Sequence, residues 1–282
     1  MTVENRLKQK KNAVEDFLKR IFLRCDSSPL VDAMRHSVLS GGKRYRPLLL
    51  LSSAEYFRVA QEESLPFACG LELIHNYSLV HDDLPAMDND DFRRGQPTCH
   101  KAFGEDVALL TGDSLLTLSF EIMANAALQH GNAAVKINLI HEISGFAGIQ
   151  GMIGGQLLDI TVSLKGLSED GLYDLMEKKT ASLITAAVRS GAILGNASSE
   201  NLKALSEYGK NLGLAFQIRD DILDAEQDKE GNLFLRPNSV SVMGFEKARA
   251  RLKKHVEISL GSLENAGINS EELRYLALML SV

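Results

Sequence analysis

Five aspartates stand between residues 82 and 91, in the segment HDDLPAMDNDDFRRG, and two arginines follow after a single phenylalanine. Two carboxylates about 4 Å apart repel each other by roughly 4 kcal/mol at an effective dielectric constant near 20. A fold that gathers these carboxylates therefore needs a positive partner, and a divalent cation would supply it. Asp82 and Asp88 lie about 240° apart on a straight helix. Because Pro85 between them disrupts a helix, we expect a break that turns Asp88 back toward Asp82.

A second acidic segment, FQIRDDILD, spans residues 216–224. On a helix, Asp220 and Asp224 differ by about 40°, and Gly213 and Gln217 fall on the same face. Mg²⁺ takes one or two carboxylates and completes its shell with water and phosphate oxygens. A lone pair of aspartates more often marks a solvated surface, but two such clusters flanked by apolar sequence favour a magnesium site.

A ferritin-like di-iron bundle is the competing metal site. It needs two Glu-x-x-His motifs on facing helices. The sequence holds one such motif, at Glu72–His75. Magnesium with a phosphate-bearing ligand therefore fits this chain better than iron.

Basic residues gather in three segments that such a ligand could use. GGKRYRP covers residues 41–47, RRG follows the first acidic cluster, and EKKTASLI covers residues 177–184. Each segment alone is typical of a surface patch. Together with the acidic clusters they indicate two anionic groups, one bound through Mg²⁺ and the other held directly by arginine and lysine. The residues concerned are Lys43, Arg44, Arg46, Arg93, Arg94, Lys178, Lys179 and Thr180.

The overall composition argues against several classes of partner. The net charge of −6 at pH 7 disfavours nucleic acid or an anionic membrane as the main partner. The three cysteines have no metal-ligand spacing. The N-terminal segment lacks the apolar core of a signal peptide, and the apolar stretch Val107–Leu128 carries two acidic residues that make it too polar to span a bilayer comfortably. We expect a cytoplasmic protein with no nucleic-acid or membrane partner.

The elements that position these residues are predicted to be helices. Alternating strand patterns of useful length are missing, and the six prolines lie near predicted breaks. We therefore predict one all-α domain over residues 1–282, a single large bundle of about ten helices. Apolar side chains recur at three- and four-residue steps most clearly through residues 43–58, 64–83, 106–128, 172–194 and 202–216.

A glycine series runs through GFAGIQGMIGGQLLDI, residues 145–160. It lacks the Gly-Lys-Ser/Thr ending of a phosphate-binding loop. We therefore predict close helix packing, which offsets a helix-propensity cost of about 1 kcal/mol per glycine. Gln156 and Asp159 at the end of the series are candidates for facing a cavity.

Seven segments in a fixed order carry a resemblance to a known family. They are GGKRYRP, LIHNYSLVHDD, DDLPAMD with RRG, GDSLL, GGQLLD, KT and FQIRDDILD, from about residue 25 to residue 224. The chain resembles the trans-isoprenyl diphosphate synthases, most closely the bacterial farnesyl diphosphate synthases. The resemblance implies an isoprenoid synthase fold with a deep central cavity and a homodimer. It also implies elongation of dimethylallyl or geranyl diphosphate by isopentenyl diphosphate to give farnesyl diphosphate.

The same resemblance assigns roles to individual residues. It implies about three Mg²⁺ ions on the aspartates of the two clusters, namely Asp82, Asp83, Asp88, Asp220, Asp221 and Asp224. The allylic diphosphate would be held by Arg93, Lys179, Thr180 and Gln217. Isopentenyl diphosphate would be held by Gly42, Lys43, Arg46, His75 and Arg94. Stabilising the departing diphosphate is the catalytic task, and it would fall to Asp82, Asp83, Asp88, Asp220, Lys179 and Arg93.

Two further features bear on product length and on closure of the site. Tyr77 resembles the bulky residue at which short-chain synthases stop chain growth, and an ordinary buried tyrosine is the alternative. After Asp224 the family continues to a Lys-x-Thr-Tyr-Pro segment, whereas this chain reads AEQDKEGNLFLRPNSVSVMGFEKA. Arg236 stands nearest to the missing lysine and would take its place toward the allylic diphosphate, with Lys229 as a competing candidate.

Three alternatives to a farnesyl diphosphate synthase stay open. A geranyl or geranylgeranyl diphosphate synthase would share the motifs. A terpene cyclase would share the bundle and the first aspartate motif, but its second site usually carries an Asn/Ser/Glu pattern where this chain has DDILD. A weakly active or regulatory chain of the same fold would explain the altered loop, although the intact aspartates argue against it.

Overall fold

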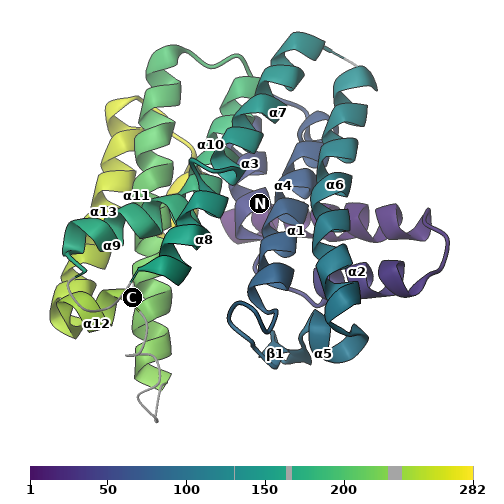
Figure 1. Cartoon of the computed structure of the whole chain (residues 1–282). Helices are drawn as coiled ribbons and strands as arrows, with labels where there is room; N and C mark the ends of the chain where they lie inside the picture. The colour runs from purple at the N-terminus through teal and green to yellow at the C-terminus, as the bar shows by residue number, and fades with distance from the viewer. Residues whose placement is uncertain (130, 163–166, 228–236, 282) are drawn as a thin grey trace.

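The computed structural model describes residues 1–129, 131–162, 167–227 and 237–281. Within these residues the chain is a helical bundle with one two-stranded hairpin (Figure 1). The elements in chain order are α1 (Val3–Leu23), α2 (Pro29–Leu39), α3 (Tyr45–Tyr56), α4 (Gln61–Asp82), β1 (Phe92–Arg93), β2 (Gln96–Pro97), α5 (Cys99–Phe103), α6 (Glu105–Gln129), α7 (Ala133–Ala147), α8 (Met152–Thr161), α9 (Glu169–Met176), the π-helical turn η1 (Glu177–Ala181), α10 (Ser182–Leu194), α11 (Ser199–Gln227), α12 (Ser239–Met243), α13 (Phe245–Asn265) and α14 (Glu271–Leu278).

Two helices, α4 and α10, form the centre of the bundle. Both have buried residues on all sides, as a helix surrounded by other helices requires. α10 packs against α3, α7 and α11, and α4 packs against α3 and α6. Leu50, Ile74 and Leu183 from three of these helices are fully buried. The rigid centre thus carries the C-terminal end of α4, where the first acidic cluster begins.

Several helices begin where the sequence supplies a hydroxyl group as a cap. The side chains of Thr2, Ser28, Ser168 and Ser270 accept a hydrogen bond from a backbone N–H in the first turn of α1, α2, α9 and α14. Such a cap satisfies one of the N–H groups that lack a partner within the helix. These caps fix the first residue of each helix, which the apolar pattern alone does not define.

The two ends of the chain are tied together over α3. Glu272 of α14 is buried and accepts from Ser52 of α3 over 2.6 Å and from Arg6 of α1 over 3.1 Å. It also pairs with Lys10 of α1, whose side chain is buried. A buried carboxylate with donors from both neighbouring helices is fully satisfied, so it fixes α1 and α14 against the core.

The predicted all-α architecture is confirmed, and α3, α4 and α6 begin and end within about three residues of the predicted stretches. One detail was wrong. Pro66 does not mark a break but lies inside α4, where it lacks the N–H that would donate to the carbonyl of Glu62 one turn earlier. The stretch 172–194 is helical, as its periodicity predicted, and it contains the π-helical turn η1 between α9 and α10.

Two glycines hold η1 between its neighbours. A Cβ on Gly155 of α8 would lie 2.2 Å from the backbone nitrogen of Lys179, and one on Gly213 of α11 would lie 2.3 Å from Cα of Ala181. Neither position admits a larger residue without moving the turn. Gly155 confirms the predicted close packing for the glycine series, whereas the prediction was wrong for Gly145, which has open space around it.

Candidate active site

The first acidic cluster lies where α4 ends. The helix stops at Asp82, and the chain turns so that the Asp88 N–H donates to the Asp82 carbonyl over 2.8 Å. The predicted return of Asp88 toward Asp82 is thereby confirmed. Burial raises the pKa of Asp82 to about 7, and Asp88 adds to the rise while Lys179 opposes it. Burial therefore destabilises the ionised form of Asp82, and a bound cation would stabilise it.

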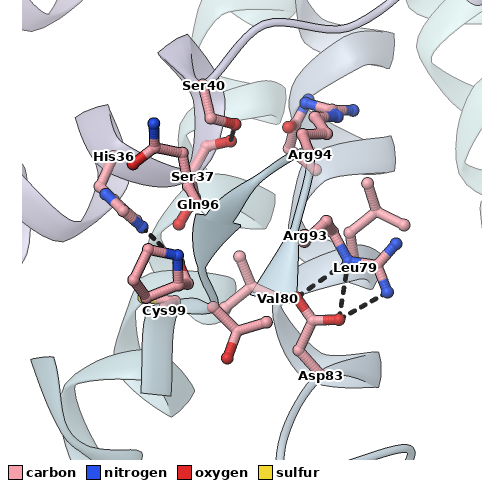
Figure 2. Close-up of a pocket in the computed structure, with 13 residues that line it drawn as sticks. His36, Ser37, Ser40, Leu79, Val80, Asp83, Arg93, Arg94, Gln96 and Cys99 are labelled. Carbon is pink, nitrogen blue, oxygen red and sulfur yellow. Dashed lines mark hydrogen bonds and ion pairs between the residues drawn. The ribbon is translucent and has the colours of Figure 1, made fainter. Parts of the chain in front are cut away.

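Asp83, the next residue, is already paired. It is buried, and Nε of Arg93 donates to both of its carboxylate oxygens over 2.7 and 3.0 Å, as Figure 2 shows. Arg93 also reaches Asp90 at 3.3 Å. Asp83 therefore orients Arg93 at the edge of the cluster. Its predicted role as a metal ligand stays a prediction, and that role requires the pair to open.

Arg93 and Arg94 are carried by the hairpin β1–β2. Arg93 pairs with Gln96 across the hairpin, and Arg94 and Gly95 between them both have a positive φ, 55° and 76°. A two-residue turn with positive φ at both positions matches the twist of a hairpin. The left-handed conformation is unfavourable for arginine by about 1–2 kcal/mol. Such strain at a charged residue is typical of a functional position.

The strained turn brings Arg94 against the glycine pair of the GGKRYRP segment. Its Nη1 donates to the Gly41 carbonyl over 2.5 Å. A Cβ on Gly42 would lie 3.1 Å from Cζ of Arg94, and Gly42 has a φ of 135°. Glycine at this position therefore serves both the backbone conformation and the close approach of the guanidinium. Two basic segments that lie far apart in the sequence meet here.

The GGKRYRP segment supplies one structural arginine and one arginine that faces the site. Arg44 is fully buried and is bound by Glu15 at 2.7 Å, by Glu72 at 2.8 Å and by the Val38 carbonyl at 2.6 Å. Arg46 is also buried, but its Nε has no hydrogen-bond partner within the described residues, and burial lowers its pKa. A buried cation that is incompletely paired has a place for an anion.

His75 lies within this cationic region. Burial lowers its pKa well below the usual range, and Arg46 and Arg94 act in the same direction. The imidazole is therefore neutral. Lys43 lies at the exposed rim, with Nζ 5.8 Å from the centre of the Phe216 ring. The region offers an anion the buried guanidinium group of Arg46, the exposed one of Arg94, a neutral hydrogen-bonding ring and an exposed ammonium.

The second acidic cluster lies on α11. Burial raises the pKa of Asp220 to about 6, and Asp224 adds to the rise. Asp221 is engaged instead, because its oxygens accept from Nε2 of Gln217 over 2.8 Å and from the N–H and hydroxyl of Ser239 over 2.7 Å each. Each cluster thus contains one aspartate that is committed to protein donors, Asp83 or Asp221, and one whose pKa is raised by burial, Asp82 or Asp220.

The turn η1 connects the two clusters. Thr180 donates to Gln217 over 2.6 Å, and Nζ of Lys179 pairs with Asp159 of α8 at 2.5 Å. Lys179 also acts electrostatically on Asp82. Through these two side chains the turn reaches both clusters. Single π-helical turns inside α-helices occur frequently at functional sites, and here the wider turn carries two predicted site residues in adjacent positions.

A divalent cation fits the donors of the two clusters. Burial raises the pKa values of Asp82 and Asp220, so ionised carboxylates there need a positive partner, whereas Asp83 and Asp221 are committed to protein donors. Within the described residues no group of three or more metal-ligating side chains occurs. Diphosphate oxygens and water would therefore complete the shell of Mg²⁺, as this ion commonly requires. Asp82, Asp88, Asp220 and Asp224 stay the predicted ligands.

Tyr77 lies in α4, before the first cluster. It is buried, its ring packs edge to face against His81 at 5.8 Å between centres, and its hydroxyl has no partner within the described residues. Burial raises its pKa to about 12, and Asp82 contributes in the same direction. The ring thus lies near the first cluster, and its role in limiting chain length stays a prediction.

Sequence reasoning missed two residues, flagged a third without its partner, and named two that lie outside the described residues. Glu72 is the buried counter-ion of Arg44, and Ser239 caps Asp221. Asp159 was flagged for its place at the end of the glycine series, but its partner Lys179 was not foreseen. An acid within an otherwise apolar helix was the signal available for Glu72. Arg236, like Lys229, lies outside the described residues.

Comparison with known proteins decides the family. The polyprenyl synthetase family matches residues 27–232, which is most of the chain. The chain belongs to the polyprenyl synthetase family. The farnesyl diphosphate synthase of Geobacillus stearothermophilus is 39% identical, and the match covers 98% of this chain and 96% of that relative. The geranylgeranyl diphosphate synthase of Cyanophora paradoxa is 42% identical over 79% of this chain and 75% of that relative.

A solved structure confirms the fold of this polyprenyl synthetase. The apo crystal structure of an FPP/GFPP synthase from Zymomonas mobilis superposes with a TM-score of 0.88 and 35% identity, covering 100% of both chains. The chain therefore has the isoprenoid synthase fold. It is an isoprenyl diphosphate synthase, a prenyltransferase of isoprenoid biosynthesis, as the ordered motifs predicted.

Proposed function

We propose that this chain is a farnesyl diphosphate synthase that joins isopentenyl diphosphate to dimethylallyl or geranyl diphosphate. The observation that carries the proposal is a pair of distinct anion sites. One comprises the two acidic clusters with Lys179 between them, and the other is the cationic region around Arg46 and His75. A condensing enzyme needs a place for each of two diphosphates, whereas a cyclase acting on a single substrate needs only the first.

The allylic diphosphate binds at the acidic clusters. When held by their carboxylates, Mg²⁺ supplies positive charge where negative charge develops on a leaving diphosphate. Lys179 and Arg93 add fixed positive charge from the chain itself. Thr180 and Gln217 are already joined by a 2.6 Å hydrogen bond, so this pair is ordered before the allylic diphosphate binds.

Isopentenyl diphosphate binds in the cationic region. Arg46 is buried and Arg94 is exposed at the hairpin, and a diphosphate would accept from both guanidinium groups. Lys43 at the rim adds a third cation, and Gly42 lets Arg94 approach the loop backbone. His75 enters as a neutral ring, so it contributes a hydrogen bond rather than charge.

The reaction then needs no protein nucleophile. The carbon–oxygen bond of the allylic diphosphate breaks, and the electron pair leaves with inorganic diphosphate. The isopentenyl double bond supplies two electrons to the resulting allylic cation and forms the new carbon–carbon bond. A proton leaves the adjacent carbon, and the departed diphosphate is the nearest base. The positive charge of the site keeps that diphosphate in place.

The relatives leave a second product length open. The Cyanophora paradoxa relative is a geranylgeranyl diphosphate synthase, which favours a product of twenty carbons as the second candidate. The buried Tyr77 favours fifteen, because a ring near the first cluster shortens the space for a growing chain. Turnover with Mg²⁺, isopentenyl diphosphate and each of dimethylallyl, geranyl and farnesyl diphosphate tests the proposal, with products identified by mass spectrometry. Products that stop at farnesyl diphosphate support it, and extension of farnesyl diphosphate contradicts it.

We further propose that the enzyme is a cytoplasmic homodimer in which a second copy covers α6. This helix is long and apolar enough to cross a membrane, and 33% of its most apolar window is buried within the chain. Leu110 is 54% and Leu128 is 83% exposed. Asp113 and Glu121 are exposed on the same helix, and carboxylates in hydrocarbon are costly. Another protein surface therefore suits α6 better than lipid.

The oligomeric state tests this part of the proposal. Sedimentation of the purified chain is expected to give a dimer, and Leu110→Glu, which adds a charge to the apolar face, is expected to give monomers. Lys253→Glu on the exposed surface of α13 serves as the control and should leave the dimer intact. A wild-type monomer would contradict the proposed dimer.

A further inference from the structure

Asp159 has no role in the reaction described above, yet it holds a residue that does. Its Oδ2 lies 2.5 Å from Nζ of Lys179, and the two side chains are 16% and 27% exposed. Partly buried ion pairs are screened less than surface pairs. Asp159 also acts electrostatically on Asp221 of the second cluster, while Lys179 acts on Asp82 of the first. The pair therefore lies between the two groups of carboxylates.

The backbone around this pair is fixed as well. Gly155 precedes Asp159 by one helical turn on α8, so both face the same way. The absence of a side chain at Gly155 lets α8 contact the backbone nitrogen of Lys179, where a Cβ would lie at 2.2 Å. α8 thus touches Lys179 twice, once at the main chain and once at the ammonium.

We propose that Asp159 is a positioning residue that holds the Lys179 ammonium between the two acidic clusters, ready for the allylic diphosphate. The inference rests on the proposed function, which places that diphosphate there. An ammonium has three donors, and Asp159 uses one of them, so two remain for diphosphate oxygens. Without Asp159 the four-carbon stem regains rotamer freedom that binding must then remove.

The neighbouring lysine provides a matched comparison. Lys178 also pairs with an aspartate, Asp174, at 2.8 Å. That pair follows the i, i+4 spacing of a helix surface, and its side chains are 34% and 54% exposed. Exposed pairs of this kind contribute little. Loss of Asp174 therefore removes an ion pair of the same chemistry from the same turn without touching the lysine of the site.

Binding of inorganic diphosphate in the presence of Mg²⁺, measured by calorimetry, tests the proposal without turnover. Asp159→Asn is expected to weaken binding about tenfold, and Asp174→Asn is expected to change it less than twofold. Asp159→Glu, which keeps the carboxylate, is expected to recover most of the loss. The thermal midpoint of each variant checks that the fold is intact. Equal binding by the Asp159→Asn and wild-type enzymes would overturn the proposal, and so would tighter binding, because Asp159 would then compete with diphosphate.

A double-mutant cycle with Lys179→Gln separates positioning from a general effect on the fold. If Asp159 acts through Lys179, the double variant binds no more weakly than Lys179→Gln alone. Additive losses would contradict this. With geranyl diphosphate as substrate, Asp159→Asn should raise the KM for geranyl diphosphate and leave that for isopentenyl diphosphate unchanged. A wild-type chain that binds diphosphate but forms no product would refute the proposed function, while the binding series still decides the role of Asp159.

Discussion

Each acidic cluster divides its aspartates into two kinds. The carboxylate oxygens of Asp83 and Asp221 accept hydrogen bonds from protein donors, namely Arg93 for Asp83 and Ser239 with Gln217 for Asp221. Asp82 and Asp220 instead have pKa values raised by burial to about 7 and about 6. Asp83 and Asp221 therefore position protein groups, whereas Asp82 and Asp220 are the aspartates that a bound cation would stabilise. Substitutions should therefore have different consequences within the same Asp-Asp pair.

Asp82→Ala and Asp220→Ala are each expected to reduce turnover at least about a thousandfold, because each removes a predicted metal ligand. Each tenfold loss corresponds to about 1.4 kcal/mol of transition-state stabilisation. The helicity of both variants should match that of the wild type. Asp91→Ala is the control from the same acidic run, since Asp91 is exposed and pairs with Lys101 at 2.8 Å. Near-normal steady-state rates in both site variants would refute the two-cluster site.

Two substitutions at Tyr77 test product length and stability separately, because the ring is proposed to limit product length and the buried hydroxyl affects stability. Tyr77→Ala opens the space near the first cluster and is expected to give products longer than fifteen carbons. Tyr77→Phe keeps the ring and removes a buried hydroxyl that has no hydrogen-bond partner among the residues that the structure describes. It should keep the product and raise the free energy of unfolding by about 1–2 kcal/mol. A Tyr77→Ala enzyme that still stops at farnesyl diphosphate would show that Tyr77 is not the floor.

At the scale of elements, η1 depends on the two helices that contact it. α8 and α11 approach this turn through Gly155 and Gly213, and hydrogen-bonding side chains on the same two helices hold Lys179 and Thr180. A π-helical turn is less stable than a continued α-helix, so tight contacts on both sides are needed to keep it. The geometry of two site residues therefore depends on the absence of side chains at two glycines.

Gly155→Ala is expected to destabilise the enzyme and to reduce turnover by at least tenfold, because the new methyl group would meet backbone rather than a movable side chain. Gly145→Ala is the matched control from the same glycine series. It lies in α7 with no atom within 4 Å of the new Cβ, so it should gain up to about 1 kcal/mol from helix propensity. Urea unfolding and steady-state kinetics measure both. Equal behaviour of the two variants would contradict the packing account of η1.

At the scale of the whole molecule, buried titratable groups make stability depend on pH. His255 of α13 hydrogen-bonds Asn211 of α11 over 2.8 Å, and burial, with help from Arg251 and Lys254, lowers its pKa to about 4. Between about pH 4 and 6.5 the unfolded chain therefore binds a proton at this site that the folded chain does not. The contribution of His255 to stability is present above that range and is lost as the pH falls through it.

The difference in unfolding free energy between the wild type and His255→Gln is accordingly expected to shrink by about 1–3 kcal/mol as the pH falls from 7 to 4.5. Comparing the two proteins matters, because the raised pKa values of Asp82 and Asp220 act in the opposite direction in metal-free enzyme and are common to both. Urea unfolding at several pH values provides the measurement. A difference that does not change with pH would show that His255 does not titrate as described.

Features that depend on contacts between neighbours in the sequence could be predicted. Features that depend on contacts between distant helices could not. The helices followed from apolar periodicity, and the return of Asp88 followed from Pro85, since both depend on neighbours in the chain. The separate fates of Arg44 and Arg46 did not follow, because the two differ only in partners supplied by other helices. The same holds for η1, whose wider turn depends on packing against α8 and α11. The treatment of residues 1–282 as one domain stays a prediction.

The stoichiometry of a single incubation tests the central claim, that two diphosphates are held at separate sites and joined. Geranyl diphosphate, isopentenyl diphosphate and Mg²⁺ are supplied, and both substrates, inorganic diphosphate and the organic products are quantified together. We expect that one isopentenyl diphosphate is consumed and one inorganic diphosphate is released for each geranyl diphosphate, with farnesyl diphosphate as the product. Release of inorganic diphosphate without consumption of isopentenyl diphosphate, accompanied by a hydrocarbon or alcohol, would contradict this expectation.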